Sequence, residues 1–378
     1  MRRVLDDEPD SVAIVRLRTG LGDLLCTVPA LRALRAKLPS AHVVLITFRE
    51  MRDVVDRMRP WVDELLASPG YPGIPERPPQ HAEISPFFAA ARARRFTLAL
   101  QMYGANPAAN EVTERLEAKR SGGFFVPGTW DADLATHLPY PHHEHEIRRH
   151  LLLLRHLGAE QLTDSRAAAR GDGKRDGESL SFPLRPSDRV SAARLTEEVG
   201  LRAPYALVHP GATSQSRRWP AERFAAVADA LVRRGLQVAI VGIGEERALG
   251  RRVLAAMAAP AVELCGRTDL GTLAALVAEA ELLVGNDSGP AHLAATVGTR
   301  SVTLFLSGDP VRWAHAAPEH RVARVQVECN PCPHLDCPID HRCASRLEVR
   351  PVLAEVDAVL GRRTMRAWSS ASDDIAST

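Results

Sequence analysis

The sequence predicts an α/β protein with two doubly wound domains, each built on a parallel sheet. Three stretches carry this prediction. Residues 282–305 (LLVGNDSGPAHLAATVGTRSVTLF) run from an apolar strand through a Gly-rich turn and a helical segment to a second apolar strand. Residues 12–48 have the same strand–helix–strand order, and residues 205–305 repeat it several times. Ligands of such sheets bind at the carboxyl ends of the strands.

The first domain is expected to begin with a strand at Val12–Leu17, followed by a Gly-rich turn and a helix over Leu24–Leu38. Apolar residues recur in that helix three or four positions apart, at Leu24, Val28, Leu31 and Leu34. This is the spacing of one buried helix face. Pro39 ends the helix, and Ala41–Phe48 is the next predicted strand.

The middle of the chain is less regular. Pro69–Pro79 is rich in Pro and Gly and predicts a surface loop, whereas Phe96–Met102 is a plausible strand. Residues 140–158 (YPHHEHEIRRHLLLLRHLG) are expected to end in a helix. Residues 165–181 are polar and Gly-rich, which is typical of a linker near a domain boundary.

From Tyr205 onward, strands and helices alternate. Strands are expected at Tyr205–His209, Gln237–Val241, Val262–Cys265, Leu282–Val284 and Ser301–Phe305. Helices are expected at Pro220–Arg234, Arg247–Ala258, Leu270–Glu279 and Ala291–Val297. Two such halves joined by a linker would enclose a cleft.

These patterns divide the chain into residues 1–182 and 183–348, with the linker at about 165–190. Residues 349–378 are expected to supply a helix at Val349–Leu360 that packs back on the first domain, followed by a tail.

The composition is that of an ordinary globular protein, with 45% hydrophobic and 25% charged residues. A net charge of +2 gives no electrostatic footprint for nucleic acid. No apolar run reaches the ~18 residues of a membrane span, and the N-terminal residues are too polar for a secretory signal. We therefore expect a cytoplasmic protein, with peripheral contact with the inner face of the membrane left open.

The turn Gly20-Leu21-Gly22-Asp23 follows the first strand but does not fit a dinucleotide-binding motif, because Leu25 stands where the third glycine is needed. A carboxylate at the start of the helix would repel a pyrophosphate. Asp23 suits a general base that accepts a proton from a hydroxyl, and a helix cap is the alternative.

Two segments of the second half suit an anionic ligand. His209-Pro210-Gly211-Ala212 ends a strand, and the following Arg217 and Arg218 could hold a diphosphate through their guanidinium groups. A solvated arginine pair before a helix is the alternative. Asp287, Ser288 and Gly289 end another strand, and Pro290 suits the first helical turn, where free N–H groups favour an anion.

Four of the six cysteines are closely spaced, at Cys329, Cys332, Cys337 and Cys343. Two interpretations remain open: a structural zinc or iron–sulfur site, and free or redox-labile thiols. Six histidines also gather in the middle of the chain. They are expected to form a solvated face, at positions 137, 142, 143, 145, 150 and 156.

Taken together, the motifs resemble glycosyltransferase family 9, whose members use ADP-heptose donors. The matching segments are RLRTGLGDLLCTVPALRALR, HPGATSQSRRWPAERFAAVADAL, VGIGEE, LCGRTDLGTLAALVAEAELLVGNDSGPAHLAATVG and CNPCPHLDC. The resemblance implies a GT-B fold, with two Rossmann-like domains facing a cleft, the acceptor on the first and the nucleotide-sugar on the second. It also implies inversion at the anomeric carbon without a catalytic metal or other required cofactor.

Carried over by position, the resemblance makes Asp23 the general base, next to Gly20 and Gly22 on the acceptor side. Arg217 stands where the family commonly has a lysine that contacts the donor phosphates. The other implied donor contacts are Thr213, Ser214, Asp287, Ser288, Gly289 and His292, with a ribose contact from Glu245 or Glu246, of which Glu246 is favoured. His292 could alternatively be a core histidine.

Two other functions remain to be weighed: a non-hydrolysing sugar-nucleotide epimerase of GT-B fold, and an inactive nucleotide-sugar-binding protein. A dinucleotide oxidoreductase is disfavoured by the failed glycine motif. The acceptor stays undecided between a glycolipid, a cell-wall sugar and a small metabolite, and the donor base and sugar follow from the resemblance alone.

Overall fold

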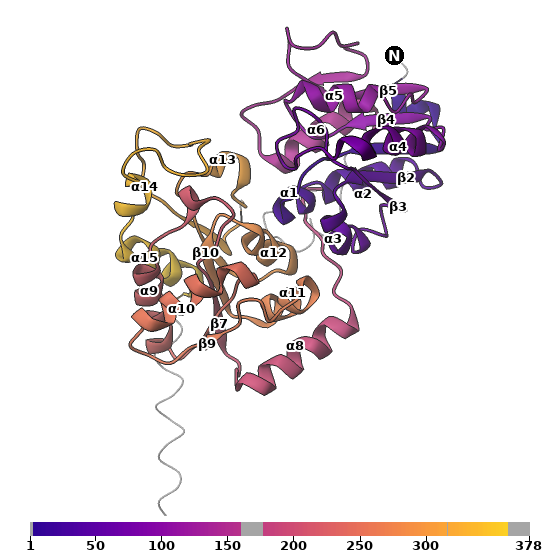
Figure 1. The fold of residues 1–378 in the computed structure, drawn as a ribbon. Helices are drawn as coiled ribbons and strands as arrows, with labels where there is room; N and C mark the ends of the chain where they lie inside the picture. The colour runs from indigo at the N-terminus through magenta and orange to yellow at the C-terminus, as the bar shows by residue number, and fades with distance from the viewer. Residues whose placement is uncertain (1–2, 160–176, 316, 362–378) are drawn as a thin grey trace, which may run out of the picture. The chain divides into compact units, whose positions relative to one another are not determined.

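The computed structural model describes residues 3–159, 177–315 and 317–361. The expected linker and tail therefore lie partly outside the described residues, at 165–176 and 362–378. The chain divides into two compact units, Met1–Pro183 and Leu184–Thr378, and each unit is built around its own sheet (Figure 1).

The first sheet has six parallel strands in the order β3-β2-β1-β4-β5-β6. The strands are β1 (Ser11–Val15), β2 (His42–Thr47), β3 (Glu64–Ala67), β4 (Leu98–Gln101), β5 (Arg120–Phe125) and β6 (His137–Pro139). The helices are α1 (Leu21–Leu25), α2 (Val28–Lys37), α3 (Arg52–Asp56), α4 (His81–Arg92), α5 (Pro107–Glu114) and α6 (Glu146–Leu157), with short 3-10 turns η1 (Val4–Asp7) and η2 (Arg49–Met51).

The second sheet repeats this arrangement, in the order β12-β11-β10-β7-β8-β9. Its strands are β7 (Tyr205–His209), β8 (Gln237–Ile240), β9 (Val262–Glu263), β10 (Leu282–Asn286), β11 (Ser301–Leu304) and β12 (His320–Ala323). The helices are α8 (Pro186–Val199), α9 (Ala221–Arg233), α10 (Arg247–Ala256), α11 (Leu270–Glu279), α12 (Gly289–Val297), α13 (Pro310–Trp313), α14 (Arg342–Ser345) and α15 (Val349–Leu360), with turns η3 (Gln215–Arg217) and η4 (Gly244–Glu246).

Both strand orders are those of a doubly wound sheet, so the predicted fold class is confirmed. The central strands are buried on both faces, as parallel strands covered by helices must be. In the first unit, side chains of β1 and β2 pack with Phe87 and Phe88 of α4. In the second unit, Trp219 and Phe224 pack with β7 and β10. These cores hold the carboxyl ends of the strands in place.

The prediction of a single helix over Leu24–Leu38 is wrong. The structure has two helices here, α1 and α2, which are separated at Cys26 and Thr27. Pro29 explains the break, because it lacks the backbone N–H needed to continue the hydrogen-bond ladder of α1. The Thr27 hydroxyl instead donates to the backbone carbonyl of Asp23 at 2.9 Å.

The helix expected to return to the first domain is α15. It has the predicted bounds, and it packs against α9, β11 and β12 of the second unit. Its buried residues Val352 and Val356 belong to the core of that unit. Among the described helices, none is long and apolar enough to cross a membrane.

Candidate functional site

Each sheet has a switch point, where the strand order reverses between neighbouring strands. It lies between β1 and β4 in the first sheet and between β7 and β10 in the second. Ligands of doubly wound folds bind at the carboxyl ends of the strands at this point. The predicted residues Asp23 and Asp287 follow β1 and β10, so the fold brings one to each switch point.

Asp23 lies in the first turn of α1, and the helix cap is Gly20, with no capping hydrogen bond from a side chain. The interpretation of Asp23 as the cap is therefore wrong. A Cβ added at Gly20 would fall 2.3 Å from Asp23 Oδ2, so the turn needs glycine where the carboxylate lies against the backbone. Gly22 is buried in the same turn.

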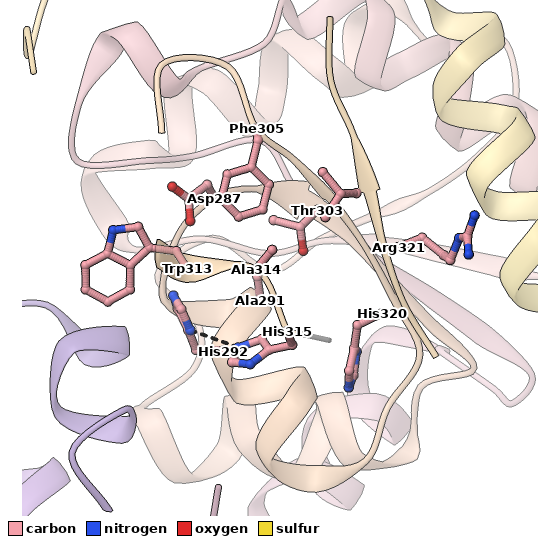
Figure 2. A pocket seen from close by; sticks show the side chains of 11 residues that line it. Asp287, Ala291, His292, Thr303, Phe305, Trp313, Ala314, His315, His320 and Arg321 are labelled. Atoms are coloured by element: carbon pink, nitrogen blue, oxygen red, sulfur yellow. Dashed lines mark hydrogen bonds between the residues drawn. The ribbon is translucent and has the colours of Figure 1, made fainter. Parts of the chain in front are cut away.

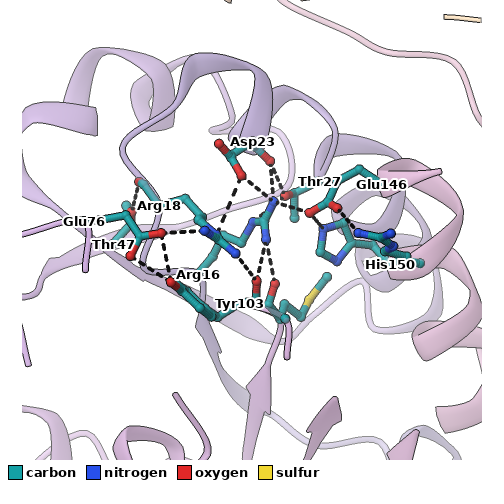
Figure 3. A network of polar contacts seen from close by, with 12 residues as sticks. Arg16, Arg18, Asp23, Thr27, Thr47, Glu76, Tyr103, Glu146 and His150 are labelled. Atoms are coloured by element: carbon teal, nitrogen blue, oxygen red, sulfur yellow. Dashed lines mark hydrogen bonds and ion pairs between the residues drawn. The ribbon is translucent and has the colours of Figure 1, made fainter. Parts of the chain in front are cut away.

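Side chains that the sequence did not single out surround Asp23, as Figure 3 shows. They are Arg16 and Arg18 after β1, Glu76 in the loop after β3, Tyr103 after β4, and Glu146 at the start of α6. The Arg18 guanidinium stacks 3.9 Å from the centre of the Tyr103 ring. The pattern Arg-x-Arg directly before the Gly-rich turn was the one sequence signal for this cluster.

In the second unit, the fully buried Asn286 joins the end of β10 to the loop after β7. Its Oδ1 accepts from the backbone N–H of Trp219 at 3.2 Å, and its Nδ2 donates to the carbonyls of Pro210 and Gly211 at 2.7 and 3.3 Å. Trp219 is itself anchored, because its indole N–H donates to Leu347 O at 2.9 Å. The two predicted anion-binding segments therefore form one site.

Arg217 and Asp287 meet in that site, with Arg217 Nη1 3.5 Å from Asp287 Oδ2. The Asp287 side chain is almost completely buried, whereas Arg217 is partly exposed. Arg218 donates to Ala212 O at 2.8 Å and is therefore a loop brace rather than half of a solvated pair. Ser288 is the N-cap residue of α12, which begins at Gly289, and its side chain makes no capping hydrogen bond.

Of the two candidate ribose contacts, Glu245 is exposed and Glu246 is buried. Glu246 Oε2 lies 3.4 Å from His209 Nε2, and His209 Nδ1 lies 3.1 Å from Ser288 Oγ. Burial opposes ionisation of Glu246, but the hydrogen bonds from His209 and the Ile243 N–H hold the pKa of this carboxyl below its ordinary value. A charged Glu246 is therefore joined through His209 to the start of α12.

His292 lies one turn into α12 and lines a pocket together with Asp287, Trp313, His315 and other residues of β11 and β12 (Figure 2). His292 Nδ1 and His315 Nε2 are 2.9 Å apart, and the His292 ring packs edge-on against Trp313. His292 is buried, as a core histidine would be, and it also lines a pocket that contains Asp287.

Thr213 is exposed in the loop after β7, whereas the Ser214 hydroxyl is buried and hydrogen-bonded. Ser214 Oγ donates to Leu335 O at 2.7 Å, and Ser216 N donates to the same carbonyl at 2.9 Å. His341 Nε2 lies 2.8 Å from Ser216 O. The Cys-rich segment therefore braces the loop that carries Arg217.

No group of three or more metal-ligating side chains is gathered among the residues that the structure describes, so the structural metal site at the four cysteines has no support. Cys329 is exposed, Cys332 and Cys337 are half-buried, and Cys343 is buried. All four are free thiols, and Cys337 Sγ accepts from the His341 N–H at 3.2 Å.

The prediction that the six histidines form a solvated face is wrong for two of them. His142 and His143 are exposed, but His137 and His150 are buried. His150 Nε2 lies 3.5 Å from Glu146 Oε1, so it belongs to the polar cluster behind Asp23.

Comparisons with known proteins identify the family of this chain. The model of glycosyltransferase family 9 (heptosyltransferase) matches residues 143–342. Lipopolysaccharide heptosyltransferase 3 of Escherichia coli is 24% identical over 302 residues, which cover 77% of this chain and 82% of the relative.

Two solved structures share the fold. A family 9 glycosyltransferase from Veillonella parvula superposes with a TM-score of 0.68 at 20% identity, covering 91% of this chain and 97% of that one. The E. coli ADP-heptose lipopolysaccharide heptosyltransferase II superposes with a TM-score of 0.67 at 19% identity, covering 93% and 98%.

The two parallel sheets and the solved structures that share them define a GT-B architecture. The chain belongs to glycosyltransferase family 9, as its sequence motifs predicted.

Proposed function

We propose that this enzyme transfers a heptose from ADP-heptose to a hydroxyl of a lipopolysaccharide-type acceptor, with inversion at the anomeric carbon. The names of its relatives, which include lipopolysaccharide heptosyltransferase 3 and an ADP-heptose lipopolysaccharide heptosyltransferase, support the donor and the acceptor class. Such an acceptor is anchored in a membrane, so we expect the enzyme to work in the cytoplasm at the inner membrane face.

The observation that carries this proposal is the Arg217–Asp287 pair at the start of α12. A diphosphate sugar has an anionic part and a hydroxyl-rich part, and this pair offers a guanidinium to the first and a carboxylate to the second. Glu246 would accept hydrogen bonds from the ribose hydroxyls, and His292 would contact the sugar–phosphate end. Thr213, Ser214 and the N–H groups of Ser288 and Gly289 complete the proposed donor site.

In the proposed reaction, Asp23 accepts the proton of the acceptor hydroxyl while that oxygen forms a bond to the anomeric carbon. The bond between the anomeric carbon and the diphosphate oxygen breaks, and ADP leaves with the electron pair. Arg217 and the start of α12 stabilise the negative charge that develops on the diphosphate. Attack on the face opposite the leaving group inverts the anomeric centre.

The test combines ADP-heptose with a panel of truncated lipopolysaccharides and follows ADP release together with the mass of the product. We expect Asp23→Asn to lower turnover by about 10²–10⁴-fold while leaving the affinity for ADP unchanged. Asp53→Asn, at an exposed carboxylate in the first turn of α3, is the matched control and should keep full turnover. Full turnover in Asp23→Asn would remove Asp23 as the base.

A further inference from the structure

The Asp23 carboxylate faces two arginines. Arg16 Nη2 lies 3.5 Å from Asp23 Oδ1, and Arg18 Nε lies 3.7 Å from the same oxygen (Figure 3). Arg16 also donates from Nη2 to the backbone carbonyl of Asp23 at 2.9 Å, so it fixes both the backbone and the side chain. Two neighbouring cations orient a carboxylate well, but they also favour its charged form and so weaken it as a base.

Each of these arginines is paired with a second carboxylate. Arg16 Nη2 donates to Glu146 Oε1 at 2.9 Å, and Arg18 Nη1 donates to Glu76 Oε1. The two glutamates come from segments far apart in the sequence, the start of α6 and the loop after β3. The positive charge that would act on Asp23 is therefore shared with two other anions.

The second carboxylates are themselves held in place. Glu76 lies within 2.9 Å of the Tyr103 hydroxyl through both of its oxygens. Glu146 Oε2 accepts from Arg149 Nη1 at 3.0 Å. The charged and titratable groups facing Asp23 through this network come from four segments: Arg16, Arg18, Glu76, Tyr103, Glu146, Arg149 and His150.

Burial makes this balance of charges effective. Arg16 is fully buried and Glu146 is 1% exposed, so solvent screens their charges little. Burial opposes the charge of Arg18, but Asp23, Tyr103, Glu76 and Glu146 raise the pKa of its guanidinium, so Arg18 stays charged beside Asp23. Without the two glutamates, the full charge of both arginines would act on Asp23.

We propose that Glu76 and Glu146 are positioning residues that offset the charges of Arg18 and Arg16, so that the arginines orient Asp23 without suppressing its ability to accept a proton. This inference rests on the proposed role of Asp23 as the general base. It explains why a buried ion pair, Arg16–Glu146, and a half-buried one, Arg18–Glu76, stand behind the single proposed base.

The test is the pH dependence of kcat/KM between pH 4 and 8. The assay uses ADP-heptose with the acceptor that supports turnover. Alternatively, water serves as the acceptor and ADP release is the signal. In Glu76→Gln the charge of Arg18 acts unopposed on Asp23. We expect the acid limb of the profile to move down by about one pH unit. Turnover at neutral pH should fall about tenfold with KM for ADP-heptose unchanged. Glu146→Gln should act in the same direction.

Two further variants separate this role from a merely structural one. Arg18→Gln should move the acid limb to higher pH, and the double variant Arg18→Gln/Glu76→Gln should return it to the wild-type position. Glu64→Gln, which removes the ion-paired carboxylate next to Arg94 in the same unit, should leave the profile in place.

An acid limb that stays at the wild-type pH in folded Glu76→Gln and Glu146→Gln, or in Arg18→Gln, would overturn the inference. Thermal melting of each variant checks that it is folded. If a glutamate variant does not fold, Arg18→Gln still tests whether the charge of Arg18 acts on Asp23. If the proposed function itself is wrong, the result differs, because Asp23→Asn then keeps its turnover. If Asp23→Asn loses turnover but the acid limbs of the glutamate variants stay in place, only the role of the glutamates is overturned.

Discussion

The Glu246 carboxylate lies directly against the α-carbon of Gly211: a Cβ added at Gly211 would fall 1.9 Å from Oε1 and 2.1 Å from Cδ. The same relationship recurs at the other two carboxylates of the sites. A Cβ at Gly20 would fall 2.3 Å from Asp23 Oδ2, and one at Gly308 would fall 2.2 Å from Asp287 Oδ2. Glycine therefore makes room for each carboxylate at the end of a strand.

Gly211→Ala should displace Glu246 and weaken ADP binding by about tenfold, which corresponds to ~1.4 kcal/mol. Isothermal titration calorimetry with ADP measures the change. Gly244→Ala in the neighbouring turn is the matched control, because nothing lies within 4 Å of a Cβ at that position. Equal affinities for the two variants would contradict a contact between Glu246 and the nucleotide.

Asn286→Asp should lower the free energy of unfolding by about 3 kcal/mol at neutral pH. The amide donates to two carbonyl oxygens, and a carboxylate in its place would face them without a proton to give. Urea unfolding of the two proteins measures the loss. Asn106→Asp is the control: its amide also donates to a carbonyl, Gly73 O, at 2.7 Å, but its side chain is only half-buried, and its oxygen caps α5, a role that aspartate also fills. A loss as large in the control would show that the burial of Asn286 is not the cause.

Glu246 should make stability depend on pH in the acid range. Its pKa is lower in the folded protein than the ordinary value of 4.5, so its stabilising contribution is fully present above that value and is lost as the pH falls through the folded pKa. The difference in stability between wild type and Glu246→Gln should therefore be largest at neutral pH and shrink below about pH 4.5. Urea unfolding at several pH values tests this, and a constant difference would contradict it.

The six cysteines should react with iodoacetamide in an order set by exposure and pKa. Burial, followed by the hydrogen bond with Glu263, raises the pKa of the Cys265 thiol to about 12, and burial also raises the pKa of Cys343. The exposed Cys329 should therefore be alkylated first at pH 8, and Cys265 only after unfolding. Peptide mass spectrometry resolves the order, and early labelling of Cys265 would contradict the burial.

Local sequence patterns were sufficient for the elements that are short, apolar and bounded by turns. The strand Tyr205–His209 and the helices Leu270–Glu279 and Val349–Leu360 have their predicted bounds. The break before α2 was missed because the apolar spacing runs through it, whereas Pro29 acts on the backbone hydrogen bonds. Of the first unit's outer strands β3, β5 and β6, none carried a clear periodic signal.

The candidate site divides in the same way. Asp287 directly follows β10, and Asp23, Arg217 and Glu246 lie in the turns that follow β1, β7 and β8, so their positions followed from the order of elements. The positions of Glu76 and Glu146 could not be predicted in this way, because only the order of the strands in the sheet brings them close to Asp23. A chain of about fifty residues separates Asp23 from Glu76, and no local pattern encodes that both carboxylates lie next to Arg18.

The common strand order of the two sheets has a consequence for engineering. The network around Asp23 is built from residues of Met1–Pro183, and the Arg217–Asp287 site from residues of Leu184–Thr378. A chimera that joins the first half of this protein to the second half of another family member at this boundary would inherit each set of contacts whole. With the roles proposed above for the two sites, acceptor choice and donor choice could be recombined as separate modules. Natural diversification by exchange of gene segments would meet the same favourable boundary.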